Sequence, residues 1–386
     1  MQIKLSATVA VLFATLFLHI LSPVDAQTQN PLQQALLFTL ESNPTSVLGF
    51  ASSSVDPTTV DRKLLEMYIK NNLYPLWLNE DGPGMKAQAL LEVLQNSHKD
   101  GVNPVDYHIE SMLELWQSRD PVQLAGLDVM LTLALGTYVT DMREGRADPC
   151  LLDPKLFASA RDKEVDIEQL VVHALAAADL TIFLMQQSPA HQAYLGLRKA
   201  LAKYSNIADQ GGWQTIAAGP TIKPGMEDKR LPLIAGRLAV TGDLSEIPPD
   251  STLYSDTLVE AVNRFQQRFN LEVDGVIGKK TLAAMNIPVQ DLIERIIINM
   301  ERWRWLPNKL DGKRILVNIA GFQLAGINNE QVEIHMPVIV GKVYHKTPVF
   351  SNTLRYIVLN PFWNIPSSIA VNETRPSQIE NPEYLQ

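Results

Sequence analysis

Residues 261–282 read AVNRFQQRFNLEVDGVIGKKTL, and this stretch decides the fold of the unit around it. Four apolar residues recur at helical spacing and share one helix face: Leu258, Val262, Phe265 and Phe269. Asp274-Gly275 and Gly278 supply turn chemistry, because glycine reaches positive φ without a Cβ penalty and aspartate caps such turns. The pattern therefore predicts a helix, a turn and a second helix in a compact unit of residues 251–288.

The sequence before this unit has a helical pattern from about residue 31 to residue 242. Apolar residues follow three-and-four spacing in residues 64–68, 89–94 and 127–139. Glycine and proline clusters separate these segments, and each gives the chain a place to reverse direction. We expect the segments to pack as a bundle of helices.

The pattern changes to strands after a short helix through Ile296, Met300 and Trp303. Segments rich in valine and isoleucine predict four strands: residues 314–320, 322–327, 331–340 and 354–359. Short connections, with Asn328-Asn329 as a hairpin turn, favour an antiparallel meander that leaves an edge and an apolar face uncovered. The fold class expected is multi-domain α+β, namely helices, a small three-helix-type unit and the start of a mostly β domain.

The N-terminus has the order of a secretory signal. Lys4 precedes an apolar stretch at residues 9–21, and small residues at 24–26 form a cleavage site before Gln27. The alternative is an uncleaved membrane anchor, but the stretch is shorter than the roughly 20 apolar residues that span a bilayer. We expect residues 1–26 to be a signal peptide, with no membrane span after its cleavage.

Charge and cysteine content exclude two classes of function. The formal net charge of −9 argues against a nucleic-acid partner. Cys150 is the single cysteine, so no intramolecular disulfide forms. Asp148 and Asp153 flank Cys150 and raise a thiol pKa, and no histidine lies nearby, so we do not expect Cys150 to be a nucleophile.

Four stretches in order resemble the large murein L,D-transpeptidases, which combine a helical scaffold domain, a peptidoglycan-binding module and a cysteine catalytic domain. In the scaffold the resemblance rests on residues 76–78, 100–107, 127–138 and 145–149. The stretch quoted first is similar to the small helical peptidoglycan-binding domain of many wall enzymes.

That resemblance gives the binding-module motif as four residues: Phe265, Asp274, Gly275 and Gly278. A purely structural role competes with it, because Phe265 is also expected in the core and the other three are turn formers.

The most diagnostic resemblance is to the beginning of the L,D-transpeptidase catalytic domain. It runs through residues 299–307, 315–320, 336–342, 347–350 and 359–366. It makes Asn360, Trp363 and Asn364 candidates for lining the substrate groove, although an aromatic bracketed by prolines is as readily a packing residue.

In this family a cysteine thiolate attacks a tetrapeptide stem, forms a thioester and passes the acyl group to an amine of a neighbouring stem. The resemblance places the catalytic histidine and cysteine in a later motif that this chain does not contain. His335 and His345 have no partner nucleophile, so we expect them in solvent or in a hairpin. We therefore expect a chain cut before its catalytic motif, with no catalytic residue of its own.

The predicted function is that of a periplasmic peptidoglycan L,D-transpeptidase whose present chain is inactive. Its expected partners are peptidoglycan stem peptides and glycan, with other wall-synthesis enzymes as further candidates, and ligand spacing indicates no metal or organic cofactor. We expect domains at residues 27–249 (scaffold), 250–290 (peptidoglycan binding) and 291–386 (partial catalytic domain). Two alternatives are a wall-binding protein and a helical scaffold that positions other wall enzymes.

Overall fold

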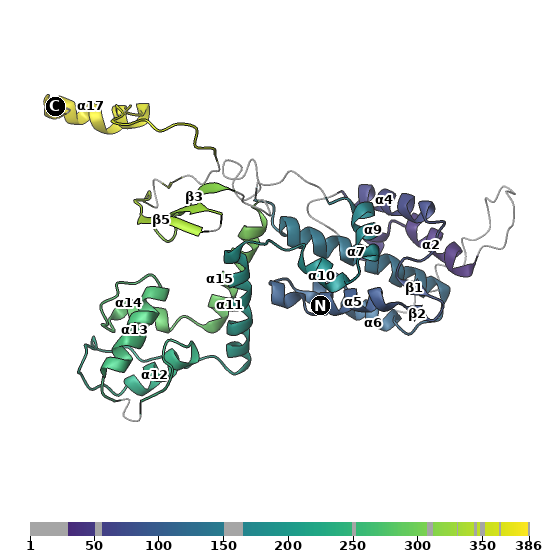
Figure 1. Ribbon diagram of the computed structural model, residues 1–386, viewed down its shortest axis with the longest axis horizontal. Helices are drawn as coiled ribbons and strands as arrows, with labels where there is room; N and C mark the ends of the chain where they lie inside the picture. Colours follow the sequence, from purple (N-terminus) through teal and green to yellow (C-terminus); the bar gives the residue numbers. More distant parts are fainter. Residues whose placement is uncertain are drawn as a thin grey trace. The chain divides into compact units, whose positions relative to one another are not determined.

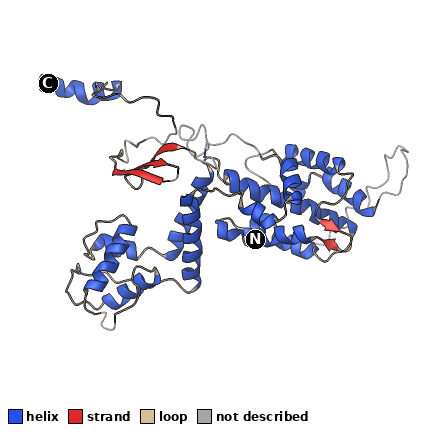
Figure 2. Ribbon diagram, viewed as in Figure 1, coloured by secondary structure: helices blue, strands red, loops and turns tan. Residues whose placement is uncertain are grey.

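The computed structural model describes residues 30–50, 56–149, 165–248, 252–306, 312–329, 331–342, 346–347, 352–362 and 364–384. The predicted signal peptide, Cys150, His345 and Trp363 lie outside the described residues. The chain divides into two compact units, Met1–Thr347 and Pro348–Gln386. The predicted α+β class is confirmed, because helices dominate the first unit up to residue 304 and a small sheet follows (Figure 2).

The first part of unit one is a helical bundle. Its elements are α2 (Pro31–Glu41), α3 (Pro44–Val47), α4 (Pro57–Lys70), α5 (Met85–Gln95), η1 (Ser97–Asp100), η2 (Pro104–Tyr107), α6 (Ile109–Leu115), α7 (Pro121–Glu144), α9 (Ile167–Ala176) and α10 (Leu180–Met185), with a two-stranded ladder of β1 (Leu78–Asn79) and β2 (Gly82–Pro83). One continuous hydrophobic core joins these helices. The predicted bundle is confirmed.

Helix α7 is the centre of this bundle, and α2, α5, α6 and α9 pack against it. Asp120 begins the helix by accepting hydrogen bonds from the N–H groups of Val122 and Gln123. Among the described helices, α7 alone has the length and hydropathy of a membrane span, yet 67% of that stretch is buried inside the fold. Its apolar surface is therefore used by the bundle's own core.

A fully buried carboxylate fixes α7 to the loop before β1. Asp128 accepts hydrogen bonds from the backbone N–H groups of Leu76 (3.0 Å) and Trp77 (2.8 Å) and from the hydroxyl of Tyr68 (2.7 Å). Burial raises the pKa of Asp128 to about 6, against the opposing effect of these donors. The contact explains why residues 76–78 and Asp128 occur together in one scaffold.

The chain then leaves the bundle and returns to it along two neighbouring helices. These are α11 (Gln192–Asp209) and α15 (Val289–Arg304), which Figure 1 shows side by side. Between them lies a small helical unit with its own core from Ile216 to Met285, built on α12 (Leu231–Val240), α13 (Asp256–Arg268) and α14 (Lys279–Met285). This core begins at Ile216, before the predicted start of the peptidoglycan-binding domain at residue 250. The predicted domain limits stay predictions.

Helix α15 is held by the bundle. Buried Arg304 donates to the carbonyl oxygen of Asp100 and to the hydroxyl of Tyr194 on α11 (3.1 Å), and Ile297 lies beside Gly101. Arg198 of α11 forms an ion pair of 2.7 Å with the same Asp100. The predicted helix is confirmed, but the residues assigned from sequence to the start of the catalytic domain pack on the scaffold side.

The sheet of unit one is the antiparallel meander that the sequence predicts. Strands β3 (Lys313–Asn318), β4 (Gln323–Asn328) and β5 (Gln331–Pro337) pair in the order β3-β4-β5. Asn329 lies in the turn after β4 with a φ of +46°. On one face Leu324 is half-buried, while five other apolar residues are 44–59% exposed, as expected for an uncovered face: Ile315, Val317, Val332, Ile334 and Met336.

The predicted fourth strand at residues 354–359 is wrong. The backbone there has no regular secondary structure and belongs to the second unit. A segment rich in valine and isoleucine becomes a strand only where a neighbouring strand takes its backbone hydrogen bonds, and none pairs with it among the described residues. The second unit otherwise contains α16 (Ser367–Ile369), the π-helical turn η3 (Ala370–Thr374) and α17 (Arg375–Glu380).

Candidate functional site

The four residues of the predicted binding-module motif lie in and beside one turn of the small helical unit. Phe265 is fully buried in α13, and Gly278 is the N-cap of α14. Gly275 has a φ of +65°, and a Cβ on it would lie 2.9 Å from Cγ1 of Val259. Glycine is therefore required at position 275 on two grounds, namely backbone conformation and space.

Gln266 organises this turn from inside and was missed by the sequence analysis. Its side-chain oxygen accepts from the N–H groups of Asp274 (3.2 Å) and Gly275 (3.0 Å), and its amide donates to Oδ1 of Asp274 (2.9 Å). Asp274 also accepts from the N–H of Val276, and these donors lower its pKa. A glutamine inside an amphipathic helix can be recognised as a residue that holds a turn only when the turn is known to lie beside it.

A second polar cluster, buried at Arg237 and exposed at Arg268, joins the small helical unit to α11. The guanidinium of Arg237 lies 3.5 Å from the ring centroid of Trp213, and its Nε donates to the carbonyl oxygen of Met285 (2.9 Å). Arg268 donates to the hydroxyl of Tyr204 on α11 (2.7 Å) and pairs with Asp243 (2.5 Å). The module therefore has a defined attachment to the helix that carries it.

The predicted groove residues lie in the second unit. Asn360 is exposed with a φ of +50°, a conformation that asparagine tolerates better than other non-glycine residues, and Asn364 is also exposed. In the described part of the chain neither side chain has a hydrogen-bond partner. Their role as groove residues remains a prediction. His335 is exposed on β5, as predicted.

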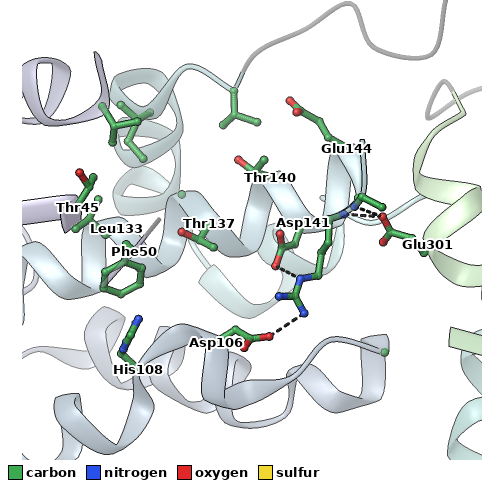
Figure 3. A pocket seen from close by; sticks show the side chains of 18 of the residues that line it. Thr45, Phe50, Asp106, His108, Leu133, Thr137, Thr140, Asp141, Glu144 and Glu301 are labelled. Atoms are coloured by element: carbon green, nitrogen blue, oxygen red, sulfur yellow. Dashed lines mark hydrogen bonds and ion pairs between the residues drawn. The ribbon is translucent and has the colours of Figure 1, made fainter. Parts of the chain in front are cut away.

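A cavity of about 930 Å³ opens in the helical bundle and was not predicted from the sequence (Figure 3). One stripe of α7 forms its floor, with Leu133, Thr137, Thr140 and Asp141 at helical spacing. The last turns of α15, including Arg302, form part of its wall. The cavity has the size of a ligand site, for which about 300–1,000 Å³ is usual.

The two ends of this cavity differ in chemistry. At one end the rings of Phe50 and His108 pack with 4.6 Å between their centroids and a tilt of 60° between their planes. At the other end, where Figure 3 labels Asp106 and Asp141, these two carboxylates form ion pairs with Arg146 at 2.7 Å and 3.7 Å respectively. Two carboxylates thus share one guanidinium.

Burial raises the pKa of Asp141 to about 6, although the hydroxyl of Tyr107 donates to it at 2.8 Å. A buried carboxyl with a raised pKa beside a cavity is a frequent property of functional sites.

The wall at the charged end is held by Glu301 of α15. Its Oε1 accepts from the backbone N–H groups of Arg146 (2.6 Å) and Ala147 (2.9 Å) and from Nε1 of Trp305 (3.1 Å). This contact joins positions 155 and 154 residues apart in the chain. No local sequence pattern reports a contact of that range, which is why the cavity was missed.

Three family models match the chain in succession. One described as "Scaffold domain" matches residues 62–201, one described as "Putative peptidoglycan binding domain" matches residues 235–285, and one described as "L,D-transpeptidase catalytic domain" matches residues 312–386. The resemblance inferred from the sequence motifs is confirmed in identity and in order. The sheet falls within the third match, whereas the cores of the bundle and of the small helical unit begin before the first residues of their matches and continue into them.

The name of one similar protein agrees with this assignment. A protein of Haemophilus influenzae named "Putative L,D-transpeptidase" is 28% identical over 95 residues. The alignment covers 25% of this chain and 19% of that protein. The chain therefore aligns with about a fifth of the relative's length.

Proposed function

We propose that this chain is the scaffold and wall-binding part, together with the first strands of the acyl-transfer domain, of a periplasmic peptidoglycan L,D-transpeptidase. The observation that carries the proposal is the unbroken order of the three domain matches, with a motif turn in the second that Gln266 holds in place. The signal-like residues 1–26 support export.

We further propose that these 386 residues do not carry out the transfer by themselves. Acyl transfer in this family needs a thiolate, a base within hydrogen-bond reach and donors for the oxyanion. The one cysteine, Cys150, lies within the scaffold match and outside the catalytic match, which contains histidines but no thiol. Binding and positioning are the functions that remain for the chain.

Co-sedimentation with purified peptidoglycan sacculi tests the binding function. The full chain should sediment with sacculi, and Gly275→Val should weaken this because its side chain would clash with Val259. Gly225→Val is the matched control, since Gly225 also has positive φ but a Cβ added to it would meet no atom within 4 Å. Failure of the unaltered chain to sediment would refute the proposal, and equal binding by both variants would remove the turn from it.

Mass spectrometry of the products tests the absence of transfer. Incubation of the chain with disaccharide tetrapeptides should yield no cross-linked dimer. Dimer formation that disappears in Cys150→Ser would show that the single thiol is a nucleophile after all.

A non-catalytic wall-binding protein is the second candidate, and the match of residues 235–285 to a peptidoglycan-binding domain favours it. A fusion of this chain to a segment that carries the histidine and cysteine motif separates the two candidates. Part of a transpeptidase should gain cross-linking activity in such a fusion, whereas a wall-binding protein should not. Failure of such a fusion to form cross-links, with sacculus binding intact, would favour the binding protein.

A further inference from the structure

The cavity along α7 contains hydrogen-bonding groups that the fold itself does not use. Thr137 and Thr140 are half-buried on its floor, and within the described residues neither hydroxyl has a hydrogen-bond partner. Thr132 of the same helix is fully buried, and its hydroxyl bonds Tyr68 (2.9 Å) and Trp77 (2.9 Å). The two hydroxyls line the cavity and are not used by the fold, so they are accessible to the hydrogen-bonding groups of a ligand.

The charged end of the cavity favours a cation. Four carboxyl groups line the cavity against three cations, which leaves an excess of one negative charge when all are ionised: Asp106, Asp141, Glu144 and Glu301 against Lys63, Arg146 and Arg302. Asp106 and Asp141 share the single guanidinium of Arg146. A primary amine placed beside them would balance the second carboxylate and gain charge-assisted hydrogen bonds. At the other end, Phe50 and Leu133 offer apolar contacts for small aliphatic groups, beside the polar side chains of Thr45 and His108 (Figure 3).

The three features lie along one helix, in the order of an elongated ligand. Figure 3 shows Phe50 and His108 at one end, Thr137 and Thr140 in the middle and Asp141 towards the other end. A backbone amide offers both a donor and an acceptor to the hydroxyls. A short peptide with an amine at one end therefore matches the cavity better than a sugar, because Phe50 is only 7% exposed and offers no open ring face for stacking.

We propose that this cavity of the scaffold binds a short amine-bearing peptide, and that the peptide is a stem of peptidoglycan. The choice of a peptidoglycan stem rests on the proposed function, whereas the choice of an amine-bearing peptide rests on the cavity alone. The scaffold, like the small helical unit, would then bind peptidoglycan. The amine of the bound peptide lies against Asp106 and Asp141, and the backbone amides of the peptide form hydrogen bonds with Thr137 and Thr140.

Calorimetric titration of the full chain tests the site. The probe is the free tetrapeptide L-alanyl-γ-D-glutamyl-meso-diaminopimelyl-D-alanine, compared with the same peptide acetylated on both amines. Thr137→Val with Thr140→Val should weaken binding about tenfold, because two hydrogen bonds to the peptide are lost. Thr181→Val, at an exposed threonine of α10 outside the cavity, is the matched control and should bind as the unaltered chain does.

Three results would overturn the proposal: no binding of the tetrapeptide at millimolar concentration, equal binding by the double variant with an unchanged melting curve, or equal binding of the acetylated peptide. Sacculus sedimentation separates this failure from failure of the proposed function. Loss of tetrapeptide binding with sedimentation intact removes the cavity site only. Absence of sedimentation with tetrapeptide binding intact removes the wall-binding function and leaves the cavity as a peptide site.

Discussion

The helical bundle and the β3–β5 sheet use apolar periodicity in opposite ways. In the bundle, the residues that recur at helical spacing on α7 are buried, including Leu127, Leu131 and Leu135 at 0% exposure. In the sheet, the residues that alternate along β5, Val332, Ile334 and Met336, remain about half exposed. A pattern of apolar residues thus identifies the face made for a core, but it does not say whether the described chain supplies the other side of that core.

The buried carboxylate of α7 should give the largest effect. Asp128→Ala leaves the backbone N–H groups of Leu76 and Trp77 without their acceptor and removes one partner of the Tyr68 hydroxyl, which still bonds Thr132. At about 1–3 kcal/mol for each unsatisfied group, we expect a loss of about 4 kcal/mol in the opening free energy of α7. Native-state hydrogen exchange on α7 measures it. The control Asp120→Ala removes only the exposed N-cap and should cost about 1 kcal/mol.

Truncation of one apolar residue in each region tests the comparison directly. Leu135→Ala in the bundle core should destabilise α7 by about 3 kcal/mol, because the truncation removes fully buried apolar atoms and leaves a cavity in the core. Ile334→Ala in the sheet removes a side chain that is 51% exposed and should cost less than about 1 kcal/mol. Equal losses in local opening free energy would mean that the sheet face is covered in solution.

The carboxyl of Asp141 should make the bundle less stable as pH rises. Burial raises its pKa in the folded state from 3.8 to about 6, so the folded state holds this proton more tightly than the unfolded chain. The stabilisation is complete below the unfolded pKa and is lost as pH rises through the folded pKa. We expect a loss of about 2 kcal/mol between pH 4 and pH 7, because a tenfold difference in proton affinity corresponds to about 1.4 kcal/mol and solvent screens part of the effect.

Asp141→Asn is the control for that pH dependence, because asparagine does not titrate. The difference between the two stability curves isolates the carboxyl from other titrating groups. The raised pKa would be contradicted if the difference in unfolding free energy between the two proteins kept growing below pH 4. It would also be contradicted if that difference stayed the same from pH 4 to pH 7.

The smallest effect is expected at the turn of the small helical unit. Gly275→Ala should destabilise this unit about 1 kcal/mol more than Gly225→Ala, because both glycines have positive φ but only Gly275 would bring a Cβ to within 2.9 Å of Val259. Hydrogen exchange on α13 and α14 gives both values. A larger cost at Gly225 would show that the turn around Gly275 is loose.

Local chemistry made much of this fold predictable. The spacing in residues 64–68 and 127–139 identified α4 and α7, and Asp274-Gly275 identified the turn. Each of these signals acts within a few residues of the chain.

The parts that were missed depend on contacts between distant positions. Arg304 reaches the carbonyl oxygen of Asp100 across 204 residues, and this contact, not the helix pattern, places α15 against the bundle. The predicted strand at residues 354–359 failed for the converse reason, since its composition was suitable but no paired strand lies beside it among the described residues. Asn360 and Asn364 remain untested candidates, because both side chains are exposed and make no hydrogen bond among the described residues.

The most direct test of the account is hydrogen exchange of the full chain with and without soluble peptidoglycan fragments, resolved by peptide. The account places wall binding in the small helical unit, so it predicts slower exchange in the peptides that cover residues 261–282 and no change in β3–β5. Unchanged exchange across residues 261–282 while the fragments bind elsewhere on the chain would contradict it.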